Sequence, residues 1–284
     1  MLGLTLEGGA SRTVYSCGIL DALLENGIMA DKIFGVSAGS AFGVSYASKQ
    51  RGRNYRLATE FMPTPEYMGL KHLIDPKNRS YYNLDYDYDT IPNKLLPFDY
   101  ETFGQYKGEF YAVVTNVRTG RAEYLPVDEK DKTWQKLRAS CALPMLFPEI
   151  EINGEKYLDG GIADPIPYRR AMEMGCDKNI VILTRPRSYR KQTDSMTKLC
   201  IKRYAKHPEF ARAMATRAAR YNKCVEDIMA LSRAGKLFVF TPKTTFGVER
   251  IEGDRDKLKR LYEHGYKHAQ WAMDRLKQFI IHNS

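Results

Sequence analysis

Short apolar runs alternate with longer segments of helical periodicity over the first fifty residues of the chain. Residues Leu2–Leu6 form an apolar-rich run, which predicts a buried strand. Over Val14–Asn26 the apolar side chains recur at helical spacing, and Gly27 follows as a stop signal. A second buried strand is expected at Ile33–Val36 and a helix of small residues at Ser40–Gln50. This order of strand, helix, strand and helix is typical of a parallel sheet covered by helices.

The rest of the chain predicts further strands and helices by the same criteria. Residues 51–108 carry several prolines and an alternation of Tyr with Asp, so we expect helices and loops that cover the sheet there. Asn153-Gly154 lies between two short apolar runs and predicts a hairpin turn. We expect strands over 109–116, 121–125, 149–152, 155–158, 179–184 and 236–241, and helices over 133–141, 165–174, within 194–234 and over 254–281.

Together these elements predict an α/β fold with a C-terminal helical extension. The expected architecture has three layers, α/β/α, with a mostly parallel central sheet. The 284 residues suffice for one large domain with an appendage, and no Gly/Ser linker divides them. We therefore assign residues 1–190 to the α/β core and residues 191–284 to a basic helical extension packed on it.

Ser37 stands at the centre of Gly35-Val36-Ser37-Ala38-Gly39, a G-x-S-x-G sequence. Composition alone produces such a pentapeptide in roughly one chain in ten of this length, so its position decides how it is interpreted. The motif lies between a predicted strand and a predicted helix, where a nucleophile elbow requires the serine. Gly35 and Gly39 allow neighbouring backbones to pass closely.

A serine hydroxyl needs a base to become a good nucleophile, and the usual base is histidine. The late histidines His207 and His264 are expected on the surface or in the extension, away from the strand ends. Asp159 is the better candidate, because it ends a predicted strand and is followed by Gly160 and Gly161. A carboxylate there can approach the serine closely, although an ordinary Asp-Gly turn is the alternative interpretation.

The loop after the first strand offers the other component of an acyl-transfer site. Gly8, Gly9 and Ala10 are consecutive small residues that expose backbone N–H groups at the positive end of a helix. Such groups can hold an oxyanion. A phosphate-binding loop is the alternative, but neither the G-x-G-x-x-G spacing nor the lysine of a Walker loop is present.

Charge is concentrated in one segment of the chain. The net charge is +10, and residues 185–236 contain fourteen Lys or Arg against four Asp or Glu, an excess of 14 − 4 = 10. This segment is interpreted either as a solvated helical face or as a surface attracted to an anionic membrane. Nucleic acid is not expected as a partner, because no recognition motif accompanies the charge.

The cysteine, histidine and hydropathy patterns argue against a disulfide-linked, a metal-binding and a membrane-spanning protein. The five cysteines are widely spaced, which favours free thiols in a reducing compartment. No metal or other cofactor is expected, because no cluster of ligand residues has metal-site spacing. No apolar run approaches the roughly 18 residues of a membrane-spanning helix, and the N-terminus does not resemble a signal peptide. We therefore predict a cytoplasmic protein, and peripheral contact with an anionic membrane stays open as the alternative to a solvated basic face.

Three motifs in this order resemble the patatin-like phospholipases, a family of Ser–Asp acyl hydrolases. They are the Gly8–Arg12 loop, the Gly35–Gly39 elbow and Asp159-Gly160-Gly161. The segments Leu137–Pro144 and Asp159–Pro167 look like the bacterial branch of that family. The resemblance covers roughly residues 2–190 and is less specific in the remainder.

The resemblance implies a serine acyl hydrolase of the phospholipase A or lipid esterase type, acting on a lipid or other ester. Ser37 is then the nucleophile and Asp159 the proton acceptor. Arg12 either braces the loop through a salt bridge or meets a lipid phosphate. The same residues suit two alternatives, a catalytically weak lipid-binding protein and an acyltransferase. The implied oxyanion hole consists of the backbone amides of Gly8, Gly9, Ala10 and Ala38.

The chain departs from the family loop at two positions. The family usually has glycine where this chain has Ala10 and Thr13. A hole built from backbone N–H groups accepts Ala10 if its φ angle is negative. Thr13 is expected to crowd the packing under the loop.

Overall fold

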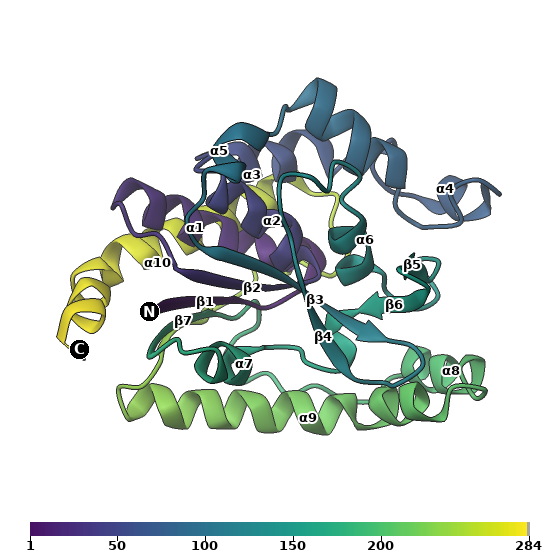
Figure 1. Cartoon of the computed structure of the whole chain (residues 1–284). Coiled ribbons are helices and arrows are strands. Elements are labelled where there is room, and N and C mark those ends of the chain that lie inside the picture. The colour runs from purple at the N-terminus through teal and green to yellow at the C-terminus, as the bar shows by residue number, and fades with distance from the viewer. Residues whose placement is uncertain (283–284) are drawn as a thin grey trace.

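The computed structural model describes residues 1–282, whose strands form one eight-stranded sheet (Figure 1). The strand order is β5-β6-β3-β2-β1-β7-β8, and β4 pairs with β3 outside this path. The strands are β1 Leu2–Leu6, β2 Lys32–Val36, β3 Glu109–Asn116, β4 Ala122–Pro126, β5 Ile150–Ile152, β6 Glu155–Asp159, β7 Lys178–Ile182 and β8 Phe238–Phe240.

The centre of the sheet is parallel and fully covered. Strands β3, β2, β1, β7 and β8 pair in parallel, whereas β4, β5 and β6 pair antiparallel at one side. Every residue of β1 and β7 is buried, as expected for parallel strands with helices on both faces. The mostly parallel α/β/α fold predicted from the sequence is confirmed.

Helices cover the sheet in two layers. The helices α1, α2 and α10 lie on one face, and α7 and α9 lie on the other (Figure 1). The α-helices are α1 Val14–Glu25, α2 Ala38–Ala47, α3 Arg53–Arg56, α4 Leu70–Ile74, α5 Tyr100–Gly104, α6 Gln135–Cys141, α7 Tyr168–Glu173, α8 Ser195–Arg203, α9 Pro208–Arg233 and α10 Arg255–His282. Short 3₁₀ turns η1 Ala10–Thr13 and η4 Gly160–Ile162 and π-helical segments η2 Leu57–Phe61 and η3 Tyr86–Leu95 complete the set.

The C-terminal helix α10 packs directly on α1. An added Cβ at Gly18 would lie 2.1 Å from the Tyr262 carbonyl oxygen, and one at Gly265 would lie 2.0 Å from that of Tyr15. The two helices therefore approach at backbone distance. Strand β8 also joins the main sheet beside β7. The division of the chain at residue 190 stays a prediction, but the segment after it contributes β8 to the sheet and one long helix to each helical layer.

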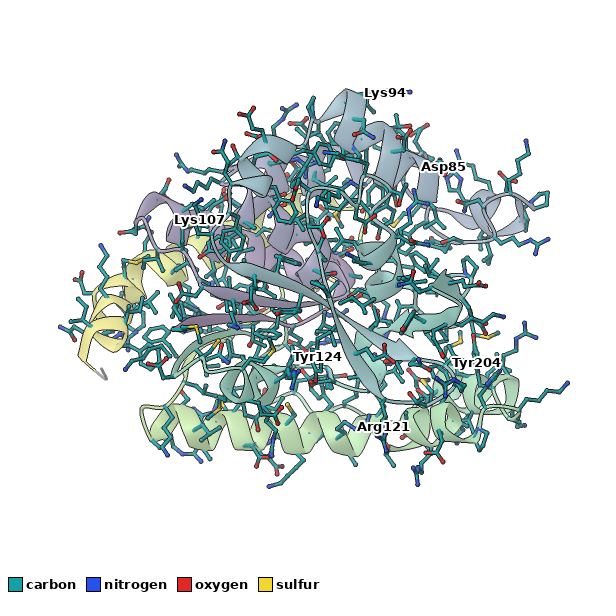
Figure 2. All side chains as sticks on the ribbon, in the orientation of Figure 1. Asp85, Lys94, Lys107, Arg121, Tyr124 and Tyr204 are labelled. Carbon is teal, nitrogen blue, oxygen red and sulfur yellow. The ribbon has the colours of Figure 1, made fainter. Side chains whose placement is uncertain are left out.

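Residues 51–108 contribute more to the interior than the sequence indicated. We expected surface helices and loops over the sheet, yet Ile91, Phe98 and Phe103 are buried and join the core. The segment, which includes α3, forms an outer layer beyond α2 (Figure 1). Figure 2 shows Asp85 and Lys94 on the outer side of this layer. The buried apolar side chains of the segment therefore face the interior, whereas Leu70, Ile74 and Leu95 are exposed.

One predicted helix begins later than its pattern indicated. A helix was expected from Pro165, but α7 begins at Tyr168. Pro165 and Pro167 lack a backbone N–H, and the residue before a proline avoids helical dihedral angles.

Among residues 1–282, no helix is both long and apolar enough to cross a bilayer.

Candidate active site

Ser37 occupies a strained turn between β2 and α2. Its φ and ψ angles are 54° and −130°, a region that residues other than glycine rarely adopt. The Ser37 N–H donates to Ser140 Oγ at 2.9 Å, and Ser140 Oγ donates to the Val113 carbonyl at 2.7 Å. The turn therefore has the strand-to-helix position and the strain of a nucleophile elbow, and Ser140 of α6 holds it from the side.

Small residues around the turn permit this geometry. An added Cβ at Gly35 would lie 2.5 Å from Ser40 Cα, and one at Gly39 would lie 2.6 Å from the Leu6 carbonyl oxygen. Gly8 is equally close, because its Cβ would lie 2.7 Å from Ser37 Cβ. The first strand, its glycine loop and the elbow thus meet at backbone contact.

Asp159 ends β6, and its carboxyl group is buried. Carboxylate Oδ1 accepts the Gly161 N–H at 2.8 Å, and an added Cβ at Gly160 would lie 2.2 Å from the Val113 carbonyl oxygen. Oδ2 forms no hydrogen bond of ordinary geometry with a described residue. Burial raises the pKa of Asp159, while the positive charge of Arg217 and the nearby hydroxyl of Ser37 act to lower it.

The glycine loop and the start of α2 supply unused donors. Within the described part of the chain, the backbone amides of Gly8, Gly9, Ala10 and Ala38 donate no hydrogen bond. Gly8, Gly9 and Ala10 line the same cavity as Ser37. These amides are available to a developing negative charge on a substrate oxygen.

The two departures from the family loop have different outcomes. The φ angle of Ala10 is +48°, so the condition of a negative φ is not met, and the alanine occupies the left-handed region that favours glycine. Thr13 is fully buried with helical dihedral angles, φ −66° and ψ −11°. Its backbone is therefore unstrained, and only its hydroxyl lacks a hydrogen-bond partner among the described residues.

Replacing Ala10 with glycine should therefore stabilise the protein. A left-handed conformation costs an alanine about 1–2 kcal/mol, and glycine loses about 0.5–1 kcal/mol through the entropy of the unfolded chain. The free energy of unfolding in urea should rise by up to about 1 kcal/mol. Ala41→Gly, within α2, is the matched control and should lower it by about 1 kcal/mol. A similar decrease for both variants would contradict the strain at Ala10.

Two cavities meet at Ser37. The polar cavity, about 60 Å³, also contains Asp159, and the apolar cavity, about 70 Å³, lies toward α2 and residues 57–88. Ala10, Ser37 and Leu143 line both. The walls of the apolar cavity include Ala41, Phe42, Leu57, Met62, Tyr67, Tyr82, Tyr88 and Phe147.

The histidines lie elsewhere. His207 precedes α9, and His264 lies on α10, where it faces Tyr15 and Phe246. Neither lines the polar or the apolar cavity. Among residues 1–282 there is also no group of three or more His, Cys, Asp or Glu side chains arranged to hold a metal ion. Two carboxylates, Glu7 and Asp159, share the polar cavity with Ser37. Glu7 is bound by Thr184, whereas the Ser37 hydroxyl acts on Asp159.

Sequence reasoning missed most of the charged wall of the polar cavity. Arg185, Lys191, Arg217 and Arg250 line it together with Arg12. Three of them belong to the basic segment 185–236, which was interpreted as a solvated face or a membrane surface. The local excess of charge was the signal, but nothing in the sequence indicates that these side chains turn toward the serine.

Two family models match parts of this chain. A family model described as patatin-like phospholipase matches residues 4–172, and one described as a domain of unknown function (DUF6363) matches residues 207–281. Lysophospholipase nte1 of Aspergillus niger is 31% identical over 185 residues, covering 62% of this chain and 11% of the relative. Lysophospholipase NTE1 of Coccidioides immitis is 26% identical over 300 residues, covering 97% of this chain and 18% of the relative.

The chain thus spans less than a fifth of the length of these curated relatives. They are fungal, so the assignment to the bacterial branch stays a prediction. The crystal structure of VipD from Legionella pneumophila superposes with a TM-score of 0.51 at 15% sequence identity, covering 96% of this chain and 66% of that one. At this identity the superposition shows the fold alone.

Proposed function

The chain belongs to the patatin-like phospholipase family, and we propose that it is a serine acyl hydrolase of lipid esters. In this proposal Ser37 is the nucleophile and Asp159 the proton acceptor. One observation carries it: the strained Ser37 shares a cavity with the buried carboxylate of Asp159, and the Ser37 hydroxyl lies near enough to that carboxylate to act on its pKa. The lysophospholipase relatives support a lipid ester as the substrate class.

The reaction we propose uses one carboxylate for every proton transfer. Asp159 accepts the proton of Ser37 Oγ as this oxygen attacks the ester carbonyl carbon. The alcohol then leaves with that proton, and the acyl group stays on Oγ. A water molecule attacks the acyl-enzyme, gives its proton to Asp159, and releases the fatty acid as the proton returns to Oγ. This is nucleophilic catalysis with a single general base.

The oxyanion is assigned to backbone donors. The amides of Gly8, Gly9, Ala10 and Ala38 are near Ser37 and otherwise unused. Loss of one such donor typically costs about 2.7–4 kcal/mol of transition-state stabilisation. Because the donors are already held by the turn, they need no rearrangement when charge develops.

The acyl chain is assigned to the apolar cavity. That cavity opens from Ser37 toward aromatic and aliphatic side chains such as Phe42, Met62 and Tyr67. Burying a methylene group there contributes about 0.8 kcal/mol. An ester with a longer chain should therefore bind more tightly until the cavity is full.

The experiment that tests this proposal is a hydrolysis panel. Released fatty acid is measured with p-nitrophenyl butyrate, a single-chain lysophospholipid, a two-chain phospholipid and a triacylglycerol. We expect ester hydrolysis without added metal, with lipid substrates preferred to p-nitrophenyl butyrate. Failure to release acid from any of the four by folded protein would contradict the hydrolase and favour a lipid-binding protein.

Contact with an anionic membrane also stays a proposal, as does a cytoplasmic location. Helix α8 supports the contact, because the exposed apolar Met196 and Leu199 lie beside the exposed Lys198 and Lys202. Such a surface suits the interface of an anionic bilayer. Binding to anionic vesicles should weaken as salt shortens the Debye length, and salt-independent binding would contradict it.

A further inference from the structure

Five cationic side chains converge on the polar cavity beside Ser37. None of them forms an ion pair with a residue of the described chain. Unpaired charges that share a half-buried site repel one another and are costly to keep there. The five are Arg12, Arg185, Lys191, Arg217 and Arg250.

Neutral groups contact three of these cations without neutralising them. Arg217 Nε donates to the Gly161 carbonyl at 2.9 Å, next to Asp159. The Arg185 guanidinium lies 4.4 Å from the centre of the Tyr189 ring, and Lys191 Nζ lies 5.0 Å from that of Tyr221. The buried Nε of Arg12 has no hydrogen-bond partner among the described residues. The cavity therefore presents oriented donors that still lack an acceptor.

The acidic groups of the cavity do not balance this charge. Glu7 accepts the Thr184 hydroxyl at 3.0 Å, and burial raises the pKa of its carboxyl group. Burial and neighbouring cations lower the pKa of Lys191 to about 8 and that of Arg12 to about 10, so both remain mainly protonated at pH 7. With Asp159 as the other acid, the cavity keeps a clear excess of positive charge.

We propose that the polar cavity binds a phosphate monoester, so that the preferred substrate is an acyl ester with an anionic phosphate head group. The inference rests on the proposed function, because the inference assigns the head group of the ester substrate to the polar cavity and its acyl chain to the apolar cavity. A phosphate monoester carries about −1.5 to −2 charge at pH 7 and three acceptor oxygens. Arginine forks match those oxygens. A choline or ethanolamine head group would instead place a further positive charge beside the five cationic side chains, which would repel it.

The site draws most of its cations from outside the segment matched by the patatin-like model. Arg185 and Lys191 follow β7, Arg217 lies on α9 and Arg250 precedes α10, all beyond residue 172. Arg217 and Arg250 fall within residues 207–281, which match the domain of unknown function. The inference therefore gives this C-terminal segment a part in head-group recognition.

A binding experiment tests the site without catalysis. Binding of glycerol 3-phosphate and inorganic phosphate is measured by calorimetry on the Ser37→Ala protein at pH 7. Adding Arg185→Gln or Arg250→Gln should weaken glycerol 3-phosphate binding by about tenfold, the effect of losing a charged hydrogen bond. Arg187→Gln, an exposed residue of the same loop, is the matched control and should leave binding unchanged. Absence of binding, or equal binding in all variants, would overturn the inference.

The source of the phosphate is tested with lipid. The Ser37→Ala protein should bind 1-acylglycerol 3-phosphate at least about tenfold more tightly than inorganic phosphate, since only the lipid also fills the apolar cavity. Equal affinity for both would identify a site for free phosphate and overturn the lipid assignment.

Hydrolysis by the wild type separates this inference from the proposed function. The kcat/KM for 1-acylglycerol 3-phosphate should exceed that for 1-acylglycerophosphocholine by about tenfold, and Arg250→Gln should reduce the preference mainly through KM. Hydrolysis of both lipids without preference would overturn the head-group inference while the hydrolase stands. If no ester is hydrolysed but the cation variants still lose glycerol 3-phosphate binding, the phosphate site stands and the hydrolase fails.

Discussion

Replacing Ser37 with alanine should abolish ester hydrolysis. We expect kcat on p-nitrophenyl butyrate to fall by about 10⁵–10⁶-fold, because no acyl-enzyme can form without Oγ. The residual rate reflects the backbone donors and the cavity, which the substitution leaves intact. Alanine keeps the Cβ atom at φ 54°, and the substitution removes only the small hydroxyl group beside Asp159. The free energy of unfolding should therefore change by less than about 1 kcal/mol.

A fluorophosphonate probe reports the same residue independently of any substrate. The probe should label the wild type and the control Ser188→Ala, an exposed serine between Arg187 and Tyr189, and should not label Ser37→Ala. Folded wild-type protein that stays unlabelled would favour the catalytically weak lipid-binding protein. Labelled protein that passes the acyl group to an added alcohol faster than to water would favour the acyltransferase.

The sequence predicted the parts of this site that depend on local pattern. The strand before Ser37, the helix after it and the strand that ends at Asp159 each carry their own hydrophobic pattern and turn residues. A parallel sheet brings the carboxyl ends of neighbouring strands to one edge. The elbow and the glycine loop could therefore be expected from the sequence to meet at that edge.

What the sequence did not predict depends on contacts between distant segments. The φ angle of Ala10 is fixed by the packing of its loop, so the alanine itself gave no warning of the left-handed turn. Arg217 reaches the carbonyl of Gly161 from a helix more than fifty residues away. Helical periodicity indicates which face of α9 is apolar, but not that an arginine of this helix contacts the chain directly after the strand that ends at Asp159.

Asp159→Asn should remove most of the activity while leaving the architecture of the site unchanged. The amide has the shape of the carboxylate and can keep the hydrogen bond from Gly161 N–H, but it cannot accept a proton from Ser37. We expect kcat to fall by about 10⁴-fold, the upper range for loss of a general base. His207→Ala and His264→Ala are the controls and should retain wild-type rates. Activity that survives Asp159→Asn and disappears in a histidine variant would indicate a Ser–His triad instead.

The pH dependence of activity and stability, compared between the wild type and Asp159→Asn, distinguishes a catalytic base from a structural residue. A protonated carboxyl group cannot accept the serine proton, so wild-type kcat/KM should fall as pH drops through the pKa of Asp159, which burial raises. The same raised pKa means that the unfolded chain ionises Asp159 more readily than the folded one. Any stability that the neutral carboxyl gives is present at low pH and is lost as pH rises through the folded pKa.

Asp159→Asn should therefore be more stable than the wild type at pH 8, with the difference disappearing toward pH 3, as measured by urea unfolding at each pH. Substituting a residue that serves only the structure would lower the protein's free energy of unfolding. Substituting a base that is held in a buried site at an energetic cost should instead lower the activity and raise the free energy of unfolding. A variant that is both inactive and less stable at pH 8 would contradict this role for Asp159.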